Sequence, residues 1–126
     1  MTKAAAIYQF WAQFGLDTYE ENSVYQLSEK PSFPYLTYEL MTDSFDGEAI
    51  SLTASLWYRS TSWTAANKKA DEISAAIGRG GMLGKCDGGL IHITRGSPFT
   101  QSMGDDTDDM IKRINLSISV EFWTEN

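Results

Sequence analysis

The residues that could do chemistry in this chain are few, and the densest group is an acidic run within residues 104–109. Its carboxylates are Asp105, Asp106, Asp108 and Asp109. Carboxylate oxygens are the ligands that Ca²⁺ prefers, but the run lacks the spaced ligands, central glycine and terminal glutamate of a calcium-binding helix-loop-helix. Adjacent carboxylates along a loop also point in different directions. The run therefore predicts a solvated loop tip or a charged contact in an assembly, and no metal site.

The other reactive side chains are isolated. His92, the only histidine, lies between two isoleucines of an expected strand, where acid-base catalysis would need a carboxylate across the sheet. Cys86, the only cysteine, allows neither an internal disulfide nor a cysteine-built zinc site. The glycine-rich residues 78–81 follow an expected helix instead of opening one, so the helix dipole is reversed for binding an anion. We therefore expect no catalytic residue, no cofactor and no enzyme activity.

Composition narrows the class of protein further. With 126 residues, 42% of them hydrophobic and 13% aromatic, we expect one folded domain covering residues 1–126. A net charge of −7 makes specific nucleic-acid binding an unsuitable main function. No signal peptide and no apolar run of membrane-spanning length are visible, which predicts a protein made inside the cell without a membrane partner.

Apolar periodicity predicts the elements that carry these residues. Helices are expected over residues 3–14 and 63–77, the second capped by Ser62, because apolar side chains recur at helical spacing. Strands are expected over residues 35–42, 48–59, 90–95 and 110–123, with a turn at 43–47 and a loop over 96–109. The order α-β-β-α-β-β predicts an α+β fold: a four-stranded, mainly antiparallel sheet with both helices on its apolar face.

The second face of this sheet is the feature that most suggests assembly. From Ile114 onward the last strand alternates, which places five apolar residues on one side and Asn115, Ser117, Ser119, Glu121 and Trp123 on the other. In the second strand, Ser51, Thr53, Ser55 and Trp57 occupy the same polar side. Fully solvated sheets more often carry Lys and Glu there, and a tryptophan outside the core often anchors a protein interface. The pattern therefore indicates an oligomer.

Several segments resemble a known family. They are Tyr-Glu-Glu-Asn at 19–22, Phe-Pro-Tyr-Leu-Thr-Tyr-Glu at 33–39 and Ser-Leu-Trp-Tyr-Arg-Ser at 55–60, followed by Gly88-Gly89 before a strand, Arg-Gly-Ser-Pro-Phe at 95–99, the acidic run and the closing strand. Together they resemble the tail terminators, or tail-to-head joining proteins, of long-tailed phages and prophages. The resemblance spans nearly the whole chain, although none of its segments is diagnostic alone.

The resemblance implies a structural virion protein that forms a ring, usually a hexamer, at the head-proximal end of the tail tube. Such a ring stops tube polymerisation and offers a surface to the head–tail connector proteins, while DNA passes through it. The implied location is the neck region of the tail, after assembly in the cytoplasm of the bacterial host. The family supplies no catalytic residue.

We expect two contact regions. One is the loop with Pro98, Phe99, Asp105, Asp106, Asp108 and Asp109; the other is the polar face with Trp57, Trp123, Ser117 and Ser119. Three alternatives stay open: a tail-tube or head-completion protein, a small ligand- or metal-binding domain or enzyme that uses the acidic run or His92, and a monomeric α+β domain of unrelated function.

Overall fold

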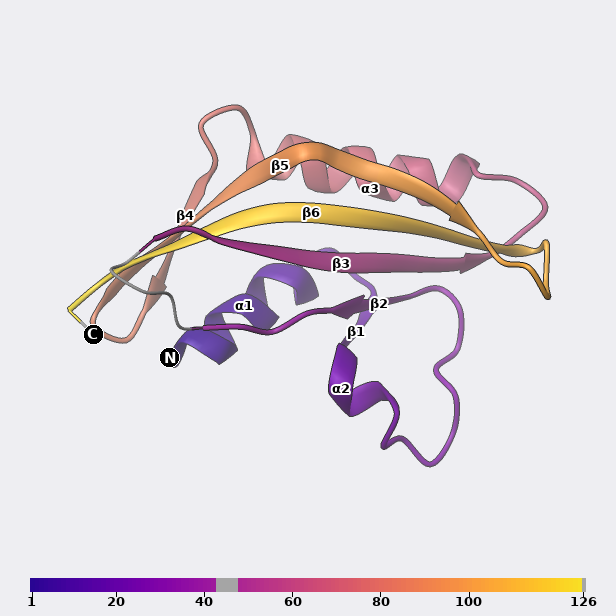
Figure 1. Cartoon of the computed structure of the whole chain (residues 1–126), viewed down its shortest axis with the longest axis horizontal. Coiled ribbons are helices and arrows are strands. Elements are labelled where there is room, and N and C mark those ends of the chain that lie inside the picture. The colour runs from indigo at the N-terminus through magenta and orange to yellow at the C-terminus, as the bar shows by residue number, and fades with distance from the viewer. Residues whose placement is uncertain (43–47, 126) are drawn as a thin grey trace.

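The computed structural model describes residues 1–42 and 48–125, which form one curled sheet with three helices (Figure 1). In chain order the elements are α1 (Lys3–Ala12), β1 (Asp17–Glu20), α2 (Glu21–Val24), β2 (Tyr35–Tyr38), β3 (Ile50–Arg59), α3 (Thr64–Ile77), β4 (Met82–Cys86), β5 (Gly89–Gly104) and β6 (Ile111–Thr124). The strand order across the sheet is β1-β2-β3-β6-β5-β4. β1 and β2 run parallel, and each of the other neighbouring pairs is antiparallel.

The expected four-stranded sheet with two helices is therefore wrong, because the chain is mostly β and its sheet is mixed. The prediction missed β1 because its four residues, which begin with Asp17 and end with Glu20, carry no readable alternation. It missed β4 because Gly84 lies inside the strand and a glycine-rich turn precedes it. The one-turn helix α2 was also missed, since an isolated helix of that length has almost no sequence signal.

The expected loop over residues 96–109 is wrong in its first half. β5 continues to Gly104, with a register shift against β6 between Arg95 and Thr100. A bulge of this kind tolerates Pro98 inside a strand, because the proline does not have to donate a ladder hydrogen bond there. The result is a long β5–β6 hairpin that runs the length of the molecule (Figure 1). The turn expected at 43–47 lies outside the described residues.

One apolar core holds the fold together, on the face of the sheet that alternation predicts. From β3 and β6, Leu52, Leu56, Ile114, Leu116, Ile118 and Val120 are at most 1% exposed. The predicted apolar stripes of α1 and α3 pack against them, including Trp11 and Ile73, both fully buried. The two-residue period of apolar side chains in the strands and their 3.6-residue period in the helices are thus sufficient to identify the residues of this core.

Helix α1 contacts both edges of the sheet, β1 at one side and β4 at the other. The sheet must therefore curl far enough for one helix to reach both edges. Thr2 caps this helix by accepting a hydrogen bond from the Ala5 amide at 3.1 Å. For α3 the cap position is Trp63 rather than the predicted Ser62, although the Ser62 hydroxyl accepts a hydrogen bond from the Thr64 amide at 3.1 Å.

Candidate functional site

The face of the sheet opposite the core, called here the outer face, carries the polar residues that the sequence placed there. Strand register aligns them in rows across β2, β3 and β6. Tyr35, Trp57 and Arg113 form one row, and Thr37, Ser55 and Asn115 form the next. Because paired residues on one face of a sheet lie side by side, each row brings together side chains from three strands.

The first row is a stack of two aromatic rings and a cation. The rings of Tyr35 and Trp57 are nearly parallel, at 10°, with centroids 5.8 Å apart, and the Arg113 guanidinium lies 4.7 Å from the Trp57 ring centroid. Such cation–π contacts contribute on the order of 1 kcal/mol. Burial raises the pKa of the Tyr35 phenol above its usual range; the charge of Arg113 acts in the opposite direction.

The second row supplies hydrogen bonds that hold the first row in place. The Trp57 indole N–H donates to the Thr37 hydroxyl at 2.9 Å. The Arg113 Nε donates to the Ser55 hydroxyl at 3.0 Å, and that hydroxyl lies 3.5 Å from the Asn115 carbonyl oxygen. Thr37 and Ser55 are the two buried polar side chains in the described part of the chain, at 9% and 4% exposure. Their polar atoms are thus satisfied by the side chains that they position.

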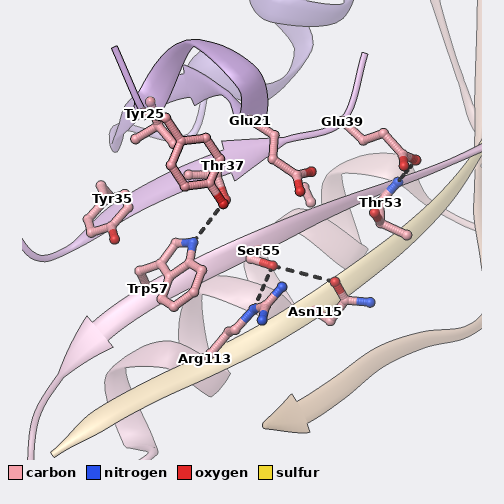
Figure 2. Close-up of a pocket in the computed structure, with 12 residues that line it drawn as sticks. Glu21, Tyr25, Tyr35, Thr37, Glu39, Thr53, Ser55, Trp57, Arg113 and Asn115 are labelled. Carbon is pink, nitrogen blue, oxygen red and sulfur yellow. Dashed lines mark hydrogen bonds between the residues drawn. The ribbon is translucent and has the colours of Figure 1, made fainter. Parts of the chain in front are cut away.

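A hollow of about 450 Å³ opens over these two rows. Figure 2 shows its lining, in which Glu21 of α2 and Tyr25, the residue that caps the end of α2, face the sheet residues across the gap. Glu39 also lines it and accepts a hydrogen bond from the Thr53 amide at 3.3 Å. A second hollow of about 550 Å³ lies beside the first, bounded by Tyr35, Trp57 and the segment that follows α2. The segment around α2 therefore stands off the sheet, and Tyr25 is 83% exposed.

Trp57 lines both of these hollows, so its side chain is only partly covered by the rest of the chain. By register it lies on the outer face, outside the core, as predicted. The sequence missed Tyr35, Thr37, Asn115 and Arg113 as its neighbours. Alternation places Arg113 on the outer face, but the register of β2 against β3 has no marker in the sequence that would align Tyr35 with Trp57.

Pro98, Phe99 and Ser117 lie together at the bulge of β5, around a smaller hollow of about 190 Å³. Gly96 contacts β6 closely here: a Cβ atom at this position would lie 2.6 Å from the Ser117 hydroxyl. The bulge thus joins part of the predicted loop to part of the predicted polar face.

The acidic run forms the turn between β5 and β6, and two of its carboxylates act within the turn. Asp105 accepts hydrogen bonds from the backbone and hydroxyl of Thr107 and from the Asp108 amide, which lower its pKa below the usual range. Asp108 pairs with Arg59 at 3.2 Å. Asp106 and Asp109 are exposed. Residues 1–42 and 48–125 contain no cluster of acidic, histidine or cysteine side chains arranged to hold a metal ion.

Trp123 and Ser119 lie towards the opposite end of β6, away from the hollow. Ten residues of strand separate Trp123 from Arg113, on the order of 30 Å. Trp123 is 45% exposed, and its ring centroid lies 5.0 Å from that of His92. The His92 Nε2 also lies 2.9 Å from the Gly80 carbonyl oxygen, so His92 is a hydrogen-bonded strand histidine as expected. The predicted contact residues therefore form four groups along the molecule: at the hollow, at the bulge, in the acidic turn and toward the far end of β6.

The sequence matches no protein-family model and no curated protein. Among the described residues, no helix is long and apolar enough to cross a membrane.

Proposed function

We propose that this chain is a structural virion protein that acts as a phage tail terminator, forming a ring at the head-proximal end of the tail tube. The sequence resemblance motivates the proposal. The observation that carries it is the outer face: α1 and α3 pack against the other side of the sheet, and the strip of β6 from Asn115 to Trp123 holds one charge, Glu121.

A face of this composition suits contact between subunits. Hydroxyl and amide side chains cost less to desolvate than charged ones, and partly exposed aromatic residues supply contact area. In a cyclic ring each subunit presents two different surfaces, which meet head to tail and close. The four groups of predicted contact residues lie along one elongated subunit, so they can serve different neighbours.

Stopping a polymer requires two unlike ring surfaces, one that fits the end of the tube and one that the next tube subunit does not fit. The proposed partners are further copies of the chain, the tail-tube protein and the head–tail connector. The proposed location is the tail neck of the virion. A net charge of −7 suits a channel through which DNA passes without adhering.

The test is deletion of the gene from the phage, followed by measurement of tail length by electron microscopy. Loss of a terminator should give abnormally long tails without heads, and the wild-type gene supplied on a plasmid should restore normal length. Tails of normal length joined to heads would refute the proposal. A tail-tube protein, the nearest alternative, would polymerise by itself into long cylinders in concentrated solution.

A second candidate function rests on the hollow under α2. Its aromatic wall, single guanidinium and two carboxylates, from Tyr35, Trp57, Arg113, Glu21 and Glu39, could also hold a small polar molecule. Calorimetric titration with nucleotides, Ca²⁺ and Mg²⁺ separates the two functions. Tight binding in a fixed ratio, abolished by Arg113→Ala, would favour a ligand-binding domain.

A further inference from the structure

The far half of β5 is an exposed edge of the sheet. β4 pairs with β5 only over Gly89–Ile93, whereas β5 continues to Gly104. Beyond Ile93, β5 is paired with β6 on one side, and no described strand pairs with its other side. Within the described chain, residues 97–104 make no backbone hydrogen bond to any element other than β6. Their outward N–H and C=O groups are thus available to another extended chain.

The part of this edge beyond the bulge is chemically unprotected. Proteins usually block a free edge with lysines, prolines, bulges or a covering element. Pro98 and the bulge protect the edge before Thr100. The four residues that follow, Thr100, Gln101, Ser102 and Met103, include no charge and no proline, and the first three are exposed. This short segment, residues 100–103, is therefore suited to pairing.

In the rows of paired residues that contain residues 100–103, the opposite edge of the sheet is β1. Register through β2, β3 and β6 places Asp17 in the row of Met103, and Glu20 in the row of Thr100. The two edge segments thus have the same length and occupy the same four rows. Residues 17–20 also make no backbone hydrogen bond beyond their pairing with β2, within the residues described.

Strand direction and charge favour joining these two unlike edges. β1 is parallel to β2, and three antiparallel steps follow to β5, so β1 and β5 run in opposite directions. Rotation about an axis parallel to the strands leaves the strand directions unchanged. Copies related by such a rotation would therefore join β5 to β1 in antiparallel pairing. Pairing β1 with β1 would instead place Asp17 opposite Glu20, an unfavourable contact of like charges.

We infer that residues 100–103 of one copy pair, antiparallel, with residues 17–20 of the next, so that the sheet continues from subunit to subunit around the ring. This inference rests on the proposed function, because it requires copies arranged in a ring. Continuation of this kind leaves neither edge unpaired, as closure does in a barrel.

Cysteine cross-linking tests the pairing directly. Thr18 and Ser102 share a row, and residues opposite each other in antiparallel strands have Cα atoms about 4.5–5.5 Å apart, within the range of a disulfide. Under mild oxidation, a mixture of Thr18→Cys and Ser102→Cys proteins should give a covalent dimer. The double variant should give a ladder of oligomers, and each single variant alone should stay uncross-linked. A mixture of Thr18→Cys with Asn67→Cys, which lies on the exposed side of α3, is the matched control.

A charge substitution identifies the partner edge independently. Thr100→Glu would face Glu20 of the next copy and should shift the mass distribution in light scattering towards monomer. Thr100→Lys at the same exposed position would face an opposite charge and should leave rings intact. If β5 paired with β5 instead, residue 100 would face the uncharged Met103, and the two substitutions would affect assembly to a similar extent.

Three results would overturn the inference: a disulfide dimer from Ser102→Cys alone, rings that form without any cross-link in the double variant, or a protein that stays monomeric in concentrated solution. Tail length in the deletion phage tests the terminator function separately from the edge pairing. Abnormally long tails combined with absent cross-linking would remove the edge pairing and leave the terminator function standing.

Discussion

The two faces of the sheet are built from the same strands, yet they differ in how completely they are packed. On the core face, Leu56 and Leu116 are fully buried. On the outer face the neighbouring residues surround hollows of about 450, 550 and 190 Å³. The alternation that predicts the first face is equally regular on the second. The polar pattern therefore locates the outer face, but it does not identify a partner.

The largest effect should come from a substitution in the core face. Leu116→Ala removes a fully buried side chain beneath the helices and should lower the free energy of unfolding by about 2–5 kcal/mol. Ser119→Ala, on the outer face of the same strand, should change it by less than about 0.5 kcal/mol. Urea denaturation measures both variants, and similar losses would contradict the difference between the faces.

A smaller loss is expected where the outer face is tightly packed. Gly96→Ala introduces a Cβ atom 2.6 Å from the Ser117 hydroxyl and 2.8 Å from its carbonyl oxygen, which should cost about 1–3 kcal/mol. Gly104→Ala, where nothing lies within 4 Å of the added atom, is the control. Equal midpoints for the two variants would show that the bulge adapts freely.

Trp57→Phe should cost about 1 kcal/mol, because it keeps the stacking but leaves the hydroxyl of buried Thr37 without its donor. Trp123→Phe should leave the stability of an isolated subunit unchanged, since Trp123 is 45% exposed. If Trp123 anchors an interface, its substitution should weaken assembly instead. Thermal unfolding and light scattering on the same samples distinguish the two effects.

The smallest effect concerns the acidic turn. Hydrogen bonds from Thr107 lower the pKa of Asp105 from its ordinary value of 3.8, so their stabilisation is present above that value and is lost as the pH falls through the lower folded pKa. Asp105→Ala should therefore unfold at a slightly lower temperature than the wild type at pH 7. The difference should disappear in strong acid; a difference that persists there would show that the charge of Asp105 is irrelevant.

The sequence predicted the core face well and the sheet edges poorly, for a physical reason. Helices α1 and α3 and strands β3 and β6 are long enough for periodicity to be read, and residues such as Trp11 and Ile118 lie where it places them. β1 and β4 are short; β1 pairs with β2 eighteen residues further on, and β4 pairs with the directly following β5 through a strand that Gly84 interrupts. The bulge in β5 depends on its pairing with β6, which a local pattern does not contain.

The candidate site shows the same limit. Trp57 and Ser117 could be assigned to the outer face from alternation alone. The row that joins Trp57 to Tyr35 and Arg113 requires the registers of three strands. The acidic run was correctly read as a loop, yet the hydrogen bonds that the Asp105 and Asp108 carboxylates accept from the backbone N–H groups of Asp108 and Met110 follow from the fold of the turn.

The contact of α1 with both β1 and β4 has a consequence for synthesis of the chain. This helix is translated before both strands, and one of its two partners is complete only when Cys86 has been added. Until then the apolar side chains of Phe10 and Trp11 lack part of their final environment. A nascent chain in this condition exposes apolar surface that promotes aggregation, so α1 stays aggregation-prone until β4 has been synthesised.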